Sequence, residues 1–270
     1  MSKAFLDTTI LTDVLLKPGP SACAAKAAMA RFTTTELPVC AIKEFKAGPL
    51  ANFVWFHNKL VQTSYEDALV ALQALSRTPR RYMTSTAIEA LRFCAYSTHQ
   101  DKLRELRLKY GEKAEMGSVI RDQYRLTLKT AVLKAWRRRR SVTSEVVEPL
   151  ACYKEVEPKQ VKDLLDVKPT KCFPERECCL AVRMRAGIDQ LQKLKEATDT
   201  QDPNSERIRR SRALGEFIRV PKRLVTENMC RDLGDAIFAF LAPPDATILT
   251  TNLKDHGPLA EAVGKRAENP

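Results

Sequence analysis

Apolar, strand-like runs lie close to the two ends of the chain, and a long helix-like stretch separates them. The early runs are KAFLD, which ends at Asp7, and LPVCA; the late run is ATILTTN. Short apolar runs bounded by polar or turn-forming residues predict buried strands. The sequence therefore predicts an α/β core with a mostly parallel sheet, formed by residues 1–65 and 225–270, with residues 66–224 as a helical insertion.

Helical periodicity dominates the remaining segments. In residues 66–77, for example, Leu69, Leu72 and Leu75 recur at spacings of three, so they fall on one face of a helix. A short strand is expected at residues 142–147. Helices are expected over residues 10–17, 21–32, 66–77, 84–98, 118–140, 174–198, 202–218 and 226–241, followed by a final short helix after residue 255.

The composition is that of a folded, mainly helical protein. The 270 residues are 44% hydrophobic and 29% charged, which are globular values. Only 9 glycines are present, which argues against a loop-rich all-β fold. The 8 cysteines include no CxxC pair, and the three histidines lie far from the group at Cys172, Cys178 and Cys179. We interpret the cysteines as buried thiols, with a zinc site as the less supported alternative.

No apolar stretch of the sequence approaches the roughly 18 residues that a membrane-spanning helix needs. The apolar segment at residues 4–16 is interrupted by Asp7 and Asp13, so it does not form the core of a signal peptide. We therefore expect a cytoplasmic protein that has no membrane partner.

Positive charge is unevenly distributed along the chain, whose formal net charge is +12. Residues 1–65 hold seven Lys/Arg and four Asp/Glu, and residues 225–270 hold four Lys/Arg and seven Asp/Glu, so the two flanks cancel. Residues 66–224 therefore carry the whole net charge. Such a region suits a nucleic acid, because phosphate contacts release counterions. It suits an anionic membrane or an acidic protein as well.

Two arginine clusters stand out within the basic region. Residues 121–140 hold eight Lys/Arg against one acid, and residues 207–223 hold seven against one. Long helices often have solvated basic faces, but no acid offsets the run at residues 137–140, which favours phosphate binding there. The candidate nucleic-acid-binding residues are Arg137, Arg138, Arg139, Arg140, Arg209 and Arg210.

Four acids lie where predicted strands give way to loops or helices, namely Asp7, Glu44, Asp235 and Asp255. Each acid taken singly has a plainer interpretation, as a helix N-cap, a solvated helix residue or a turn former. In a parallel sheet, however, residues at the carboxyl ends of strands converge on one edge. Clustered carboxylates repel one another unless a cation lies between them, and Mg²⁺ and Mn²⁺ prefer oxygen ligands. The set therefore predicts a divalent-metal site.

Three segments resemble the motifs of the PIN-domain nuclease family. LDTTILTDVLL resembles the opening of these domains, and PVCAIKEFKAG resembles their second motif. LGDAIFAFLAPPDATILTTNLKDH resembles the third and fourth motifs, in which a helix with an acid leads into a strand followed by another acid. The matches cover roughly residues 1–60 and 225–264. The resemblance implies a PIN-like three-layer core that is elaborated by a large helical insertion.

The resemblance also implies roles for individual residues and an activity. Asp7, Glu44 and Asp235 would be the catalytic metal carboxylates, with Asp255 as a fourth. The expected supporting residues are Thr9, Asp232, Thr251 and Asn252, with Asp232 as an alternative to Asp235 in binding metal. His256 stands where the family often has an aromatic residue.

The implied activity is that of a Mg²⁺- or Mn²⁺-dependent endonuclease, a hydrolase that leaves 5′-phosphate and 3′-hydroxyl ends. RNA is the more expected substrate, which makes the chain a candidate endoribonuclease. A DNA nuclease of host defence or repair is the first alternative, and an inactive nucleic-acid-binding or scaffold protein is the second. An inhibitor or partner protein could bind the helical region.

Overall fold

The computed structural model describes residues 2–76, 81–98, 104–105, 108–109, 115–148, 150, 153, 155–168, 179–220 and 226–270. The chain is α/β, and its main sheet has five strands in the order β3-β2-β1-β6-β7 with every pair parallel. The predicted α/β class with a mostly parallel sheet is thereby confirmed. The strands are β1 Lys3–Leu6, β2 Thr34–Pro38, β3 Glu145–Val147, β6 Ala246–Leu249 and β7 Arg266–Glu268.

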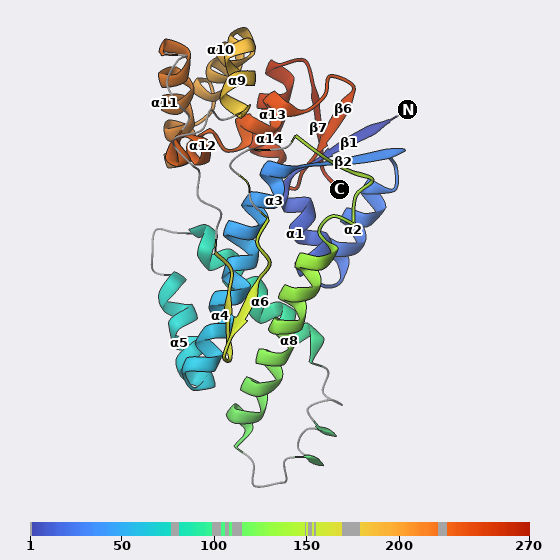
Figure 1. Cartoon of the computed structure of the whole chain (residues 1–270), viewed down its shortest axis with the longest axis vertical. Coiled ribbons are helices and arrows are strands. Elements are labelled where there is room, and N and C mark those ends of the chain that lie inside the picture. The colour runs from blue at the N-terminus through green and yellow to red at the C-terminus, as the bar shows by residue number, and fades with distance from the viewer. Residues whose placement is uncertain are drawn as a thin grey trace.

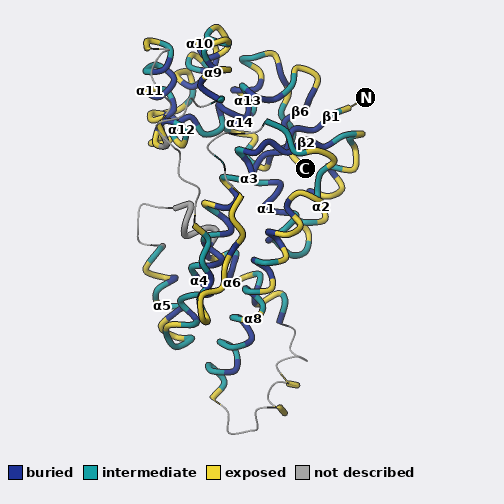
Figure 2. The backbone as a smooth tube through the Cα atoms, viewed as in Figure 1, coloured by how far each residue is buried: buried dark blue, intermediate teal, exposed yellow. Residues whose placement is uncertain are grey.

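Strand β1 lies at the centre of the sheet and joins the two ends of the chain. It pairs with β2 on one side and with β6 on the other, so that Phe5 lies opposite both Glu36 and Ile248. Ala4, Phe5 and Leu6 are completely buried. An unbroken apolar run is what a parallel strand needs when both of its faces are covered. Figure 2 shows this central part of the sheet as buried, with further buried stretches in the helices.

The strand order reverses direction at β1, because β2 and β3 lie on one side of it and β6 and β7 on the other. Ligands of open α/β sheets bind outside the carboxyl ends of the strands at such a switch point. Here the two relevant ends are Asp7, after β1, and Thr250, after β6. The Asp7 amide donates to the Leu249 carbonyl at 3.0 Å, so the two ends lie side by side.

Short helices follow the strands at this edge. α1 Thr8–Leu16 and α2 Pro20–Met29 connect β1 to β2. α3 Val39–Phe45 follows β2 and continues through the π-helix η1 Lys46–Leu50. α13 Asp235–Leu241 precedes β6, and α14 Leu253–Ala262 connects β6 to β7. We did not expect β7 from the sequence, and it completes the sheet after the final helix.

Residues 66–224, which we expected to form one helical insertion, lie in separate parts of the structure. α4 Ala51–Gln62, α5 Tyr65–Ser76, α6 Arg81–Ser97 and α8 Met116–Arg138 form a helical lobe below the sheet (Figure 1). α4 belongs to this lobe although it precedes residue 66, because it packs on α8 and α6, where the ring of Phe53 lies edge-on to that of Phe93 with centroids 5.8 Å apart. β3, from residues expected in the insertion, is instead an edge strand of the sheet.

A second helical group covers the other end of the core. It consists of α9 Cys179–Ala186, α10 Ile188–Asp199, α11 Ser205–Arg219 and α12 Glu227–Leu233, and α10 packs on α14 and α13 (Figure 1). A hairpin, β4 Lys159–Val161 and β5 Leu164–Asp166, lies against α4. Among the described residues, no helix combines the length and the apolar character needed to cross a bilayer.

Two helices that the sequence predicts as continuous are broken at glycines. The helix expected over residues 226–241 divides into α12 and α13 at Gly234, whose φ is +46°. The helix expected over residues 174–198 divides at Gly187, where an added Cβ would lie 2.7 Å from the Phe240 ring. The expected start of that helix and the cysteines at 172 and 178 lie outside the described residues.

Gly234→Ala should destabilise the protein, because an L-residue at φ +46° is strained. The expected loss in the free energy of unfolding is about 1–3 kcal/mol, measured by urea denaturation. Gly257→Ala is the matched control, since its new Cβ would meet only the Leu253 side chain, at an ordinary 3.8 Å. Equal stability of the Gly234→Ala variant and the wild type would contradict this backbone geometry.

Candidate functional site

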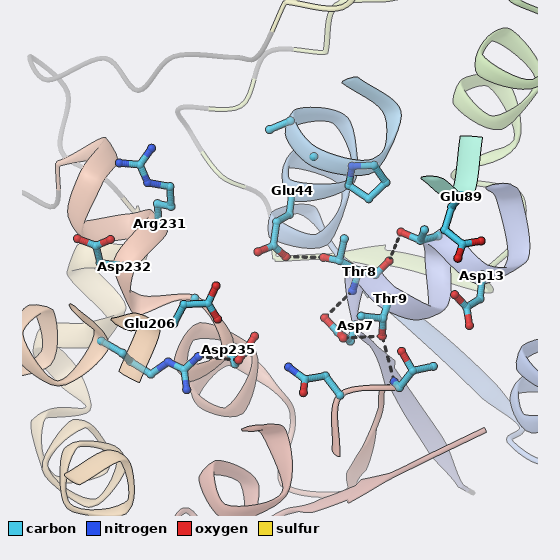
Figure 3. A pocket seen from close by; sticks show the side chains of 18 of the residues that line it. Asp7, Thr8, Thr9, Asp13, Glu44, Glu89, Glu206, Arg231, Asp232 and Asp235 are labelled. Carbon is cyan, nitrogen blue, oxygen red and sulfur yellow. Dashed lines mark hydrogen bonds and ion pairs between the residues drawn. The ribbon is translucent and has the colours of Figure 1, made fainter. Parts of the chain in front are cut away.

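A cavity of about 570 Å³ opens at the switch point of the sheet. Its walls come from α1, from α3 and η1, from α11 to α13, and from the segment after β6. Glu44 and Asp7 point into the same open space, with Asp235 and Arg231 across from them (Figure 3). The structure thus brings three of the four predicted metal carboxylates to one cavity.

Asp7 is held rigidly where β1 meets α1. It is the N-cap of α1, and its Oδ1 accepts from the Thr8 amide at 2.6 Å. Its Oδ2 accepts from the hydroxyls of Thr9 at 2.7 Å and Thr250 at 2.8 Å. Asp7 is only 3% exposed. The predicted supporting residue Thr9 therefore orients the carboxylate, and so does Thr250, which the sequence did not single out.

Glu44 reaches the cavity from the last turn of α3. Its Oε2 accepts from the Thr8 hydroxyl at 2.5 Å. Burial raises the pKa of Glu44 to about 7, and the nearby charges of Asp7 and Asp235 add to this effect. Glu44 lies within the cavity walls but is exposed by surface area, so solvent screens part of the effect of burial and of the repulsion.

Asp235, the first residue of α13, has two cationic partners. Its Oδ2 accepts from Nη2 of Arg210 at 2.6 Å, and its Oδ1 lies 3.3 Å from Nε2 of His256. Burial alone would raise the pKa of Asp235, but His256 and Arg210 outweigh burial and hold the pKa at about 2. Asp235 is therefore an ionised carboxylate with compensated charge.

His256 lies between two of the carboxylates. Its Nε2 is 3.5 Å from Oδ2 of Asp7 and 3.3 Å from Oδ1 of Asp235. Burial favours the neutral ring, yet Asp7 and Asp235 raise the pKa of His256 to about 9. The ring packs edge-on against Phe238, with centroids 5.6 Å apart. The imidazolium thus contributes a positive charge inside an acidic site.

The remaining predicted site residues have separate environments. Asp255 lies outside the cavity lining, and its Oδ1 pairs with Arg207 at 2.6 Å, so its role as a metal ligand stays a prediction. Thr251 and Asn252 line the cavity, and the Thr251 amide donates to the Thr9 hydroxyl at 3.0 Å. Asp232 lines it as well and lies 3.4 Å from Nε of Arg209.

The arginines predicted to bind nucleic acid divide into exposed and buried residues. Arg137 and Arg138 are exposed at the end of α8. Arg139 is buried, stacks on the Trp136 ring at 3.7 Å and pairs with Glu155. Arg140 also pairs with Glu155, at 3.0 Å. The expectation that no acid offsets this run is wrong, because Glu155 lies against it despite its distance in sequence.

Arg209 and Arg210 both line the cavity, but they differ in exposure. The side chain of Arg209 is half exposed, whereas that of Arg210 is 4% exposed. Glu206 and Arg231 also line the cavity, and the sequence did not indicate them. Glu206 lies outside the segments that resemble the family, and Arg231 lies just before the third of them; in the sequence both look like residues of solvated helix faces.

The donor set fits one hard divalent cation. Among the described residues, no lysine or arginine pairs with Asp7 or Glu44, and only hydroxyls, an amide and His256 approach them. Their negative charge is offset only in part, by His256, and oxygen-preferring Mg²⁺ or Mn²⁺ would relieve the rest. In the part of the chain that the structure describes, no three His, Cys, Asp or Glu side chains form a ready-made metal group.

Comparison of the chain with protein-family models, with curated proteins and with solved structures finds no match. The geometry of the site therefore carries the functional argument.

Glu44→Gln should change how stability depends on pH in EDTA. The folded-state pKa, about 7, lies above the usual 4.5, so the folded chain holds this proton more tightly than the unfolded chain. The stabilisation from that proton is present at low pH and is lost as the pH rises through about 7. The variant cannot ionise, so its Tm relative to wild type should be higher at pH 8 than at pH 5.

Thermal unfolding followed by circular dichroism between pH 5 and 8 checks this expectation. Glu261→Gln, at an exposed glutamate of α14 outside the cavity, is the control. A Tm difference between Glu44→Gln and wild type that stays constant over the range would contradict the perturbed environment of Glu44.

Proposed function

We propose that the chain is a metal-dependent endonuclease with a PIN-like core, and that its substrate is RNA. The observation that carries the proposal is the cavity at the switch point of the parallel sheet. There, within the part of the chain that the structure describes, Asp7 and Glu44 have no lysine or arginine partner, while Arg209, Arg210 and Arg231 line the same cavity. Acids that can hold a cation, beside arginines that can hold phosphate, suit phosphodiester hydrolysis.

Each group would have a defined task. Asp7 and Glu44 would hold a divalent ion, which activates water and neutralises phosphate charge when it is bound. Thr8, Thr9 and Thr250 fix the orientation of those carboxylates through their hydroxyls. The arginines of α11 and α12 would hold the phosphate against the acids, because a guanidinium binds phosphate oxygens through paired N–H groups.

The choice of RNA rests on the resemblance to the family, and the charge distribution supports a polyanion of either kind. The full net charge belongs to residues 66–224, which supply α11 and the exposed Arg137 and Arg138. A DNA substrate in defence or repair is the first alternative. Phosphate contacts do not distinguish the two polymers, whereas contacts to the 2′-hydroxyl do.

One observation favours a second candidate, an inactive nucleic-acid-binding protein. Asp235 and Asp255 each pair with an arginine, and a carboxylate in an ion pair is less available to a metal. Metal-dependent cleavage of labelled RNA, plasmid or single-stranded DNA, abolished by EDTA, decides between the two candidates. A protein that binds these polymers and cleaves none of them would establish the second.

Asp7→Asn should remove metal-dependent cleavage, and Asp235→Asn should do the same, because each loses a charge that organises the site. Thr9→Val, which keeps the shape of the side chain but loses a bond to Asp7, should lower activity by about 10- to 100-fold. Cleavage rates at equal protein and Mn²⁺ concentrations measure these effects. Wild-type rates in the Asp7→Asn variant would refute the proposed role of Asp7.

Mg²⁺ or Mn²⁺ should also raise the Tm of the wild type, because an ion that binds only the folded state stabilises it. The Asp7→Asn variant should show a much smaller rise. Melting curves recorded against metal concentration measure the effect. A wild-type midpoint that does not move up to millimolar Mn²⁺ would count against a metal site.

Substitutions of the arginines at the end of α8 should have two different effects, one on nucleic-acid binding and one on stability. In an Asp7→Asn background, replacing Arg137 and Arg138 with alanine should weaken binding of single-stranded RNA. It should also flatten the plot of log affinity against log salt, by about 0.7–0.9 per lost contact. Arg139→Ala should instead lower the Tm, because Arg139 is buried on Trp136. An unchanged salt slope in the double variant would contradict a binding role for Arg137 and Arg138.

A further inference from the structure

The four predicted metal carboxylates divide into two pairs according to their partners. Asp7 and Glu44 have no lysine or arginine partner among the described residues. Asp235 and Asp255 each form an ion pair with an arginine of α11, at 2.6 Å in both cases. Two carboxylates, Asp7 and Glu44, are therefore left to bind a metal ion, instead of the four that the sequence suggests.

Helix α11 delivers both arginines from one face. Arg207 and Arg210 are three residues apart, so their side chains project from the same side of the helix. The two side chains are only 6% and 4% exposed. Arg207 is fully engaged, because its Nε and Nη2 bind Asp255 and its Nη1 donates to the Asp202 carbonyl at 2.9 Å.

Arg210 is engaged only in part, although it is more deeply buried. Its Nη2 donates to Asp235, but its Nε and Nη1 have no hydrogen-bond partner among the described residues. Arg210 also lines the cavity, whereas Arg207 does not. Buried donors without acceptors are costly, and a phosphate oxygen is a strong acceptor for a guanidinium. The difference between the two arginines thus points to an anionic ligand at Arg210.

We infer that the Arg210 guanidinium takes the place of a second metal ion in this site. The cavity then holds one divalent ion at Asp7 and Glu44, and the guanidinium receives the substrate phosphate. This inference rests on the proposed function. Sites with two metal ions place them about 3.5–4 Å apart between several carboxylates. Here Asp235, which would be needed to hold a second ion, is already neutralised by Arg210 and His256.

Titration of the full chain with Mn²⁺, followed by calorimetry and by electron paramagnetic resonance of the free ion, tests the inference. The wild type should bind one Mn²⁺ per chain. Arg210→Met, which keeps much of the side-chain volume but removes the charge, should bind a second Mn²⁺, because Asp235 then keeps only His256 as a cationic partner. Arg207→Met is the matched control and should still bind one, since Asp255 lies outside the cavity lining.

A second measurement reports on the anion. The affinity for inorganic phosphate in EDTA should fall at least about tenfold in Arg210→Met, which is the loss expected from one charge-assisted pair. It should stay unchanged in Arg207→Met. Asp235→Asn should still bind one Mn²⁺, because Asp7 and Glu44 hold the ion, and this variant answers the question even if Arg210→Met does not fold.

The outcomes separate the inference from the proposed function. A wild type that binds two Mn²⁺ ions, or an Asp235→Asn variant that loses Mn²⁺ binding, overturns the inference and leaves the nuclease proposal standing. An Arg210→Met variant with one bound ion and unchanged phosphate affinity also overturns it. A folded wild type that binds no Mn²⁺ overturns the proposed function itself.

Discussion

The hydrogen bonds of the Asp7 carboxylate hold the two ends of the chain together at the edge of the sheet. The carboxylate accepts from Thr8 and Thr9, which begin α1, and from Thr250, which follows β6. The Asp7 amide adds a bond to the Leu249 carbonyl. Segments separated by more than 240 residues are thereby fixed around one anion. The cavity, the position of Glu44 and the approach of His256 all depend on this junction.

The charges around the junction are compensated in different ways on its two sides. On the side of α1 and α3, hydroxyls and an amide orient Asp7 and Glu44, and His256 offsets only part of their negative charge. On the side of α13, Arg210 and His256 neutralise Asp235. A cation is therefore attracted to the wall that carries Asp7 and Glu44, and an anionic ligand to the wall that carries Arg210. This asymmetry distinguishes the site from a simple ring of acids.

The sequence predicts the junction well and the arginines poorly, for physical reasons. KAFL and ATIL are short apolar runs with an adjoining Asp or Thr, so local pattern was enough to place β1, β6 and Asp7. The buried Arg210 has the same local pattern as a solvated helix face, and only tertiary contacts distinguish the two. Glu155 reaches Arg139 through a loop that no periodicity predicts. The break at Gly234 likewise depends on a backbone conformation that a helical pattern hides.

The connection between the cavity and the helical lobe has a mechanical consequence. α3, η1 and α4 follow one another without a loop from Val39 to Gln62, and the π-helix between them contains Pro49. Lys46, within that π-helix, is anchored to the Val156 carbonyl at 2.8 Å. Because no loop interrupts this helical segment, a displacement of α4 would be passed through η1 to the turn of α3 that carries Glu44.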